Sequence, residues 1–302
     1  MKNRGDFYLS QAGRGKTKEA KILLVLLAFI VVFTAVFFVF LSHRYGSAAA
    51  FFGKGEIEIT EAEDEEDKAL PAISGRVNYL IGETDDEETV LHYLYLLQAD
   101  KDNLSYKVCA LRSDMLLGEE TVSAIFETGG GAALQKQLME YFGFDIQYYA
   151  VFKKSSFVEF ANKLGTMVYS SNEEIRYSAG TEDDKYALHI NEGEQKISGT
   201  ELSNLIRYFS EEQRLSEENE LILNALTALF NEENYQKADS LFRLFVKSAT
   251  TDITVRDFEN GRDALLVFGS RFQDITKYSV TAEYEDKALT KAALTNIKGY
   301  FS

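Results

Sequence analysis

Cysteine is almost absent from this sequence. Cys109 is the one cysteine in 302 residues, so the chain cannot form a disulfide within itself, and no Cys-x-x-Cys motif offers a zinc site. Because Cys109 stands in an apolar run, we interpret it as a small core residue. Tryptophan is missing and Pro71 is the one proline. The three histidines are too widely scattered to be read as one ligand set.

Basic residues are also in short supply. The chain has 32 lysine and arginine residues against 48 aspartate and glutamate residues, which gives a formal net charge of −16. A protein that binds nucleic acid needs stripes of basic residues to contact the phosphate backbone. No such stripe is visible in this sequence, so we exclude a nucleic-acid partner. Apolar residues make up 45% of the chain and aromatic residues 13%, which is enough to bury a sizeable core.

One long apolar run lies near the N-terminus. Residues 22–41 carry no charge, and their length matches a hydrocarbon core of about 30 Å, so we predict a transmembrane helix over residues 22–42. A signal peptide cleaved near the small residues 47–50 is the alternative. Residues 1–21 are rich in lysine and arginine. The positive-inside rule therefore predicts a single-pass cell-membrane protein with a cytoplasmic basic tail and a C-terminal domain outside the cell.

The part after this span divides into a linker and a domain. Residues 43–75 are small, acidic and without periodicity, which predicts a solvated linker. Residues 76–302 alternate strand and helix patterns, which predicts a single α/β domain with a central mixed β-sheet flanked by helices. We predict strands at 76–82, 90–100, 105–112 and 145–152, and helices at 132–142, 156–165, 200–209, 216–229, 235–248 and 254–268, followed by a polar C-terminal stretch.

The predicted helix starts rest on capping residues. Ser156 with Glu159 forms a capping-box pattern, and Thr200 and Ser216 are the expected N-caps of two later helices. The glycines at 129–131 precede the helix predicted at 132–142. They could cradle a phosphate, but a flexible helix start is the favoured interpretation.

Two stretches of the domain carry patterns of a known family. Residues 129–165 read GGGAALQKQLMEYFGFDIQYYAVFKKSSFVEFANKLG, and residues 190–208 read INEGEQKISGTELSNLIRY. In order and spacing they resemble the extracellular domain of the LytR-CpsA-Psr (LCP) family, whose members are membrane-anchored proteins that attach lipid-carried glycopolymers to the bacterial cell wall. TTDIT at 250–254 is similar to a late family pattern. The resemblance covers roughly residues 76–260 and implies an LCP-like fold at the cell membrane of a bacterium of the Gram-positive type.

The resemblance also implies a chemistry. LCP proteins look like phosphotransferases in which carboxylates hold a divalent cation and arginines grip the pyrophosphate of a polyprenyl-linked donor. A pyrophosphate leaving group gains negative charge, which a metal ion or a guanidinium stabilises. By match to the family pattern, Asp114 and Arg207 are the catalytic candidates, and Arg112, Arg207 and Arg214 are the pyrophosphate-binding candidates. Asp114 and His92 are the candidates for holding Mg²⁺ or another divalent cation.

Four charged positions of the family pattern are lost. Ser113 and Phe209 each stand where the pattern has an arginine. His92 replaces an aspartate, and Glu217 replaces a further arginine. Neutral imidazole suits zinc and other borderline ions better than magnesium. Arg112 could substitute for the arginine missing at Ser113 if the turn is rearranged.

These losses leave three functions to weigh. The favoured one is a relative that binds a polyprenyl-(pyro)phosphate-linked glycopolymer in cell-wall assembly, with degenerate catalytic residues and weak or no activity. The second is an active phosphotransferase that attaches the glycopolymer to peptidoglycan or a surface polymer. The third is a membrane-anchored adaptor that binds proteins through its acidic face and has no lipid site.

Overall fold

The computed structural model describes residues 69–180 and 184–302. The predicted cytoplasmic tail, the predicted transmembrane helix and most of the predicted linker lie outside the described residues. Ala69–Ser302 form one compact unit. Within the described ranges, every helix is too short or too polar to cross a membrane.

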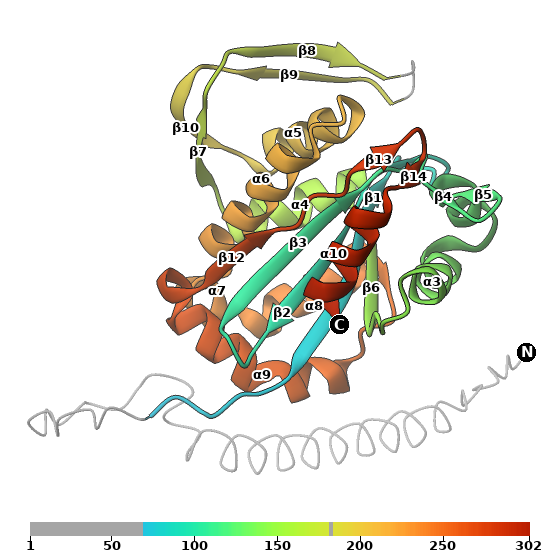
Figure 1. The fold of residues 1–302 in the computed structure, drawn as a ribbon. Coiled ribbons are helices and arrows are strands. Elements are labelled where there is room, and N and C mark those ends of the chain that lie inside the picture. The colour runs from blue at the N-terminus through green and yellow to red at the C-terminus, as the bar shows by residue number, and fades with distance from the viewer. Residues whose placement is uncertain (1–68, 181–183) are drawn as a thin grey trace, which may run out of the picture. The chain divides into compact units, whose positions relative to one another are not determined.

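A six-stranded mixed sheet forms the centre of this unit (Figure 1), in the order β11-β6-β1-β2-β3-β12. Four strands run parallel to one another and two run the opposite way. The parallel strands are β1 (Arg76–Thr84), β3 (Ser105–Leu111), β6 (Tyr148–Lys153) and β12 (Thr276–Ser279), and the reversed strands are β2 (Leu91–Asp100) and β11 (Ala249–Thr251). The predicted mixed sheet is thus confirmed.

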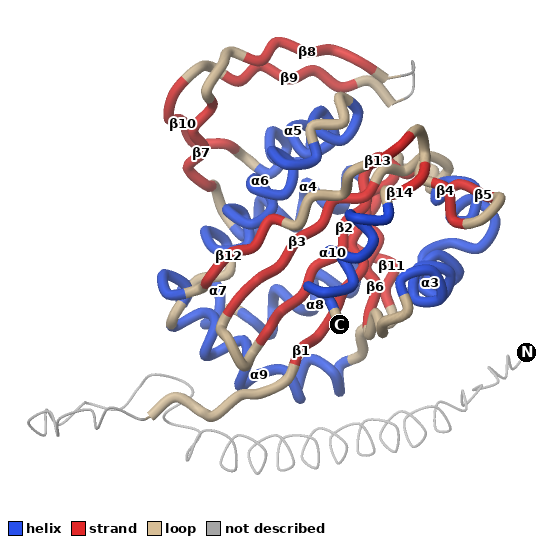
Figure 2. Tube along the Cα trace, in the orientation of Figure 1, coloured by secondary structure: helices blue, strands red, loops and turns tan. Residues whose placement is uncertain are grey.

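Helices cover both faces of the sheet (Figure 2). One face carries α3 (Val122–Phe142) and α10 (Lys291–Phe301), and the other carries α4 (Lys154–Leu164), α5 (Gly199–Glu211), α6 (Leu215–Leu229) and α8 (Ala238–Ser248). The short α7 (Glu232–Gln236) packs on α9 (Val255–Ser270). Since β3 lies between two strands and under helices on both faces, all seven of its residues are buried, including Cys109 at 0% exposure.

Apolar spacing explains why the helices next to the sheet form. In α5 the residues Leu202, Leu205, Ile206 and Phe209 recur at helical spacing, and all four are buried. The helix predicted at 235–248 is instead two helices, because the chain leaves helical geometry at Lys237 between α7 and α8.

The start of α4 differs from the prediction. Helix α4 begins at Lys154, directly after β6, and its N-cap Lys153 makes no side-chain capping bond. Ser156 is therefore not the cap. A carboxylate from the β1–β2 loop takes over part of the capping role, because Asp86 Oδ1 accepts a hydrogen bond of 2.9 Å from the backbone N–H of Ser155.

The starts of α5 and α6 also differ. Ser198, two residues before the predicted Thr200, caps α5 in a complete capping box with Glu201. Helix α6 begins at Leu215 with Arg214 as its N-cap and without a side-chain bond, so Ser216 is not the cap.

The glycines at 129–131 lie inside a helix, not before one. Helix α3 starts at Val122 behind the N-cap Thr121 and is kinked at Gly130, whose φ of 64° and ψ of −163° suit glycine alone. Gly131 is packed so closely that a Cβ there would lie 2.6 Å from Cδ2 of Tyr149. The glycines bend the helix over the sheet, so the predicted start at residue 132 is wrong.

The remaining strands form short two-stranded ribbons that the sequence patterns did not predict. Their residues bury one face only, so the apolar signal is weak. The ribbons pair β4 (Leu116–Leu117) with β5 (Glu120–Thr121), β7 (Met167–Ser171) with β10 (Gly193–Ile197), β8 (Ile175–Ala179) with β9 (Tyr186–Ile190), and β13 (Tyr284–Glu285) with β14 (Ala288–Leu289).

The predicted polar C-terminal stretch is structured. It contains a short 3₁₀ helix (Phe272–Asp274), β12, the β13–β14 ribbon and α10. The end of α10 is fixed to the sheet, because the carbonyl of Phe301 accepts hydrogen bonds from Asn78 Nδ2 (3.0 Å) and Gln98 Nε2 (3.1 Å). Lys107 Nζ donates to the carbonyl of Tyr300 at 3.0 Å.

Candidate functional site

Several charged side chains gather at one edge of the central sheet. At this edge β1, β3 and β6 end and β2 begins, since Thr84 is paired with Leu91 and Lys153. In sheets with parallel strands, ligands bind outside the carboxyl ends of those strands. This edge is therefore the first place to examine for a site.

His92, at the start of β2, connects two carboxylates. Its Nδ1 lies 3.2 Å from Oε1 of Glu83, and its Nε2 lies 2.8 Å from Oδ2 of Asp184. The ring can donate to both carboxylates only as an imidazolium. Glu83 is 0% exposed and also accepts hydrogen bonds from the hydroxyls of Tyr93 (3.1 Å) and Ser203 (2.8 Å). Both oxygens of the buried Glu83 carboxyl group therefore have hydrogen-bond partners.

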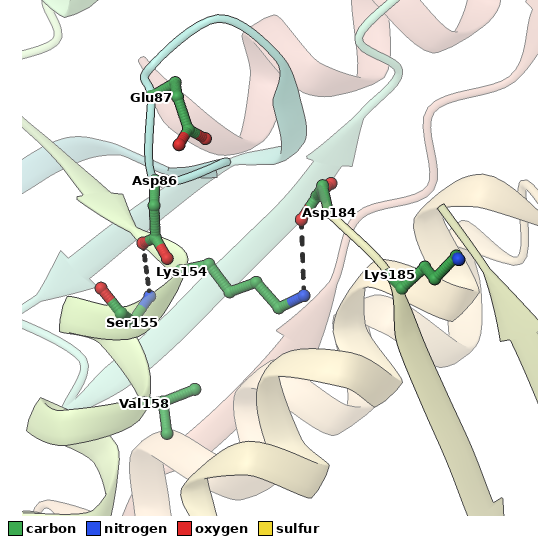
Figure 3. A pocket seen from close by; sticks show the side chains of 7 residues that line it. All are labelled: Asp86, Glu87, Lys154, Ser155, Val158, Asp184 and Lys185. Atoms are coloured by element: carbon green, nitrogen blue, oxygen red, sulfur yellow. Dashed lines mark hydrogen bonds and ion pairs between the residues drawn. The ribbon is translucent and has the colours of Figure 1, made fainter. Parts of the chain in front are cut away.

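Asp184 is contacted by three cationic groups. Besides His92, its oxygens lie 2.8 Å from Nη1 of Arg207. They also lie 3.4 Å from Nζ of Lys154, a contact that Figure 3 shows. We call His92, Lys154 and Arg207 the cation triad. Burial acts to raise the pKa of Asp184, but the charges of the cation triad outweigh burial, and this pKa is lowered. Asp184 is thus ionised at the centre of the network.

Arg207 is held on α5 with only 4% of its surface exposed. Its Nε donates a 2.8 Å hydrogen bond to Glu211, and its guanidinium carbon lies 4.4 Å from the ring centroid of Tyr186. Burial acts to lower the pKa of Arg207, yet Glu211 and Asp184 raise it by more. The guanidinium therefore stays charged in a nearly dry position, where charge interactions are strong.

A pocket adjoins this network. It has a volume of about 430 Å³ and is lined by Asp86, Glu87, Lys154, Ser155, Val158, Asp184 and Lys185. Figure 3 shows the Lys154 side chain extending from α4 across the pocket to Asp184. Asp184 and Lys154 thus belong both to the buried network and to the pocket wall.

Arg112 and Asp114 form a separate pair at the end of β3. Nε and Nη2 of Arg112 donate to the two carboxylate oxygens of Asp114, each at 2.8 Å. Nη1 of Arg112 donates to the backbone carbonyl of Asp286 at 3.0 Å, and the guanidinium lies over the ring of Tyr284. The hydrogen bonds from Arg112 lower the pKa of Asp114. These two predicted site residues therefore neutralise each other.

Arg214 lies in a third set of contacts. Its Nη1 is 2.5 Å from Glu173 and its Nε is 2.9 Å from Glu217, the glutamate that replaces an arginine of the family pattern. The structure thus joins two of the predicted residues, His92 and Arg207, through Asp184. Arg112 and Asp114 instead pair with each other, and Arg214 pairs with Glu173 and Glu217.

Sequence reasoning missed several residues of the network. Glu83 carried a usable signal, because it directly follows the strand predicted at 76–82, and an acid that a strand end carries into the core has to find partners. Asp184, Lys154 and Glu211 carried none, since each lies in a polar stretch and meets the cluster only in the folded chain.

The implied divalent cation does not fit this donor set. Within the described ranges, no group of three or more His, Cys, Asp and Glu side chains could hold a metal ion. Glu83 and Asp184 are supplied with protein donors, and Arg112 engages both oxygens of Asp114. Mg²⁺ requires free carboxylate oxygens, so as arranged here the chain's own cations take the metal's place.

Comparisons with known proteins agree with this fold. The profile of the LytR_cpsA_psr family matches residues 97–297. No curated protein sequence matches the chain. A solved structure from Eubacterium siraeum DSM 15702, described as a transcription regulator, is 14% identical with a TM-score of 0.65 and covers 80% of this chain and 97% of that one.

Two further solved structures share the fold. Bacillus subtilis TagV is 13% identical with a TM-score of 0.56, covering 76% of this chain and 96% of TagV. A structure described as TagT bound to LI-WTA is 11% identical with a TM-score of 0.53, covering 75% of this chain and 89% of TagT. At these identities the likeness shows the fold alone.

Proposed function

We propose, since the chain belongs to the LytR-CpsA-Psr family, that it binds a polyprenyl-(pyro)phosphate-linked glycopolymer in cell-wall assembly and has little or no transfer activity of its own. The observation that carries this proposal is the cation triad beside the 430 Å³ pocket. That a protein of the same fold, TagT, is described as bound to LI-WTA supports a glycopolymer partner.

The chemistry of the cation triad suits a phosphate group. A guanidinium, an ammonium and an imidazole converge from α5, α4 and β2, and charge-assisted hydrogen bonds from cationic groups are the strong ones. Arg207 is nearly fully buried, which increases its attraction for an anion. In this proposal Arg207, Lys154 and His92 bind the (pyro)phosphate.

Weak or absent transfer follows from the carboxylates. Transfer from a pyrophosphate donor needs stabilisation of the leaving charge, which metal ions or open guanidinium groups supply. Here Asp114 is held by Arg112, and Glu83 and Asp184 are held by the residues around them. Both groups proposed for catalysis, Asp114 and Arg207, are therefore occupied by internal ion pairs.

The setting of this binding is part of the proposal. The apolar run at 22–42 anchors the chain once in the cell membrane, with residues 1–21 in the cytoplasm and the domain outside. The partners are then the membrane, the lipid-linked glycopolymer, and either peptidoglycan or a surface polymer. The active phosphotransferase is the alternative, and it requires Asp114 and His92 to leave their present partners and bind Mg²⁺ or another divalent cation.

Binding of polyprenyl pyrophosphate to the full chain in mild detergent tests the proposal. We expect saturable binding, and at least tenfold weaker binding by Arg207→Gln. Arg176→Gln is the matched control, because the Arg176 side chain is 69% exposed on β8, and its affinity should equal that of the wild type. Equal binding by all three proteins, or no binding by any, overturns the proposal. Metal-dependent release of polyprenyl pyrophosphate above background would establish the active alternative.

A further inference from the structure

We propose that Asp184 is an internal competitor for the ligand anion, because its carboxylate holds the position between His92, Lys154 and Arg207 that a phosphate oxygen of the ligand would take. This inference rests on the proposed function and adds a form of regulation to the same site. Binding then requires the Asp184 side chain to be displaced.

The geometry around Asp184 is that of an anion site with its anion present. Three cationic groups from three separate elements point to one carboxylate, with distances of 2.8 Å from His92, 2.8 Å from Arg207 and 3.4 Å from Lys154. A surface ion pair needs only one such partner. The convergence of three is typical of the arrangement that proteins build around a phosphate or carboxylate ligand.

The carboxylate satisfies this site incompletely. Although Nη1 of Arg207 is buried and lies 2.8 Å from Asp184, it has no hydrogen-bond partner of good geometry among the described residues. The 3.4 Å contact of Lys154 is also long for a charged hydrogen bond. A phosphate group offers three acceptor oxygens where a carboxylate offers two. A phosphate can therefore reach donors that Asp184 leaves unused.

Asp184 is the acid that Lys154 and Arg207 share. Glu83 lies against His92 and Glu211 against Arg207, while Asp184 contacts all three basic groups. Its lowered pKa keeps Asp184 ionised at neutral pH. Its side chain is 15% exposed and lines the pocket, so a ligand in the pocket can reach it directly.

Asp184→Asn in the full chain, purified in mild detergent, tests this inference with inorganic pyrophosphate as the probe. We expect at least tenfold tighter binding than by the wild type, measured by calorimetry. Asp263→Asn is the control, because Asp263 is exposed on α9 and the substitution removes the same charge outside the pocket. It should change the affinity less than threefold. Free acetate should compete with pyrophosphate in Asp184→Asn, since it restores the missing carboxylate.

Affinity equal to or weaker than that of the wild type in Asp184→Asn overturns the inference. Asp184→Ser is measured in parallel, so that a folding defect of one variant, seen in its thermal melt, does not decide the result. The two proposals fail differently. If the wild type binds polyprenyl pyrophosphate and neither Asp184 variant binds pyrophosphate more tightly, the competitor role alone is wrong. If no variant binds either probe, both are wrong.

Discussion

Arg112 and Asp114 close the turn after β3 with two parallel hydrogen bonds, each 2.8 Å long. The family resemblance assigns one of them to pyrophosphate and the other to a metal ion. In the fold they bind each other, and the Asp114 side chain is still 40% exposed. A pair in that position contributes little to stability but determines whether either residue is free for a ligand.

The first prediction concerns this pair. Asp114→Asn should lower the free energy of unfolding by about 1 kcal/mol or less, because exposed ion pairs are worth no more. Arg112 lowers the pKa of Asp114, so the pair's contribution is present above the unfolded aspartate pKa of about 3.9 and is lost as pH falls below it. Denaturant unfolding should therefore show a smaller difference from wild type at pH 3 than at pH 7.

The neighbouring Asp286→Asn is the control for that measurement. Asp286 meets Arg112 through its backbone carbonyl, and asparagine tolerates its positive φ of 55°. Mg²⁺ should leave the melting temperature of the wild type unchanged. A Mg²⁺-dependent rise that is lost in Asp114→Asn would instead assign Asp114 to a metal.

The second prediction concerns Glu218, which is 0% exposed on α6 and whose two carboxylate oxygens have no hydrogen-bond partner among the described residues. Burial raises its pKa well above the ordinary value, so the folded chain holds it neutral. The free energy of unfolding is therefore highest, as far as Glu218 contributes to it, below the unfolded pKa of about 4.3. It falls as pH rises from there toward the folded pKa.

Glu218→Gln should therefore remove a decline in stability above about pH 4.3 that the wild type shows. Chemical denaturation between pH 4 and pH 8 measures this slope. Glu220→Gln, an exposed position on the same helix, should keep the wild-type slope. Parallel pH profiles for wild type and Glu218→Gln would show that Glu218 does not titrate in this range.

The third prediction concerns the kink of α3. Gly130→Ala should lower the free energy of unfolding by about 1–3 kcal/mol, because a φ of 64° with a ψ of −163° is strained for any residue with a Cβ. Gly299→Ala in α10 is the control. Its Cβ would meet no atom within 4 Å, and alanine favours a helix by up to about 1 kcal/mol. Equal stability changes in the two variants would contradict the role of the kink.

The fourth prediction concerns Lys107 under the end of α10. Its Nζ donates to Oε1 of Gln98 at 2.7 Å and to the carbonyl of Tyr300 at 3.0 Å. Lys107→Met keeps the aliphatic stem but leaves buried acceptors unpaired, which should cost about 3 kcal/mol. Lys136→Met, at a side chain 73% exposed on α3, should cost less than about 0.5 kcal/mol. Thermal melts of both variants measure these costs, and an equal loss of stability in the two variants would contradict the role of Lys107.

The sequence allowed the sheet and the main helices to be predicted because their apolar residues follow clear periods. β3 reads as a continuous apolar run since it is covered on both faces, and α5 shows a buried stripe. The ribbons of β7 to β10 were missed because five-residue strands that bury alternate side chains give little signal. β12 was missed for a related reason, since all four of its residues are exposed.

The site was less predictable than the fold. The family pattern located Arg207 and His92, but their shared partner Asp184 lies 92 positions from His92 along the chain, in a stretch with no motif. The pattern also identified Asp114 and Arg214 as site residues, but it did not predict that Asp114 pairs with Arg112 or that Arg214 pairs with Glu173. Ion pairing between distant segments depends on the completed fold, and the local periodicity of apolar residues carries no information about it.

The anchoring of Phe301 also bears on the order in which the protein is assembled. Asn78 in the first strand and Gln98 in the second carry amides whose acceptor is a carbonyl more than 200 positions later. A growing polypeptide can pair β1 with β2 early, but the hydrogen bonds from these amides to Phe301 form only once residue 301 has been synthesised. Contacts of such separation slow folding, so the sheet is expected to depend on chaperones while translation continues.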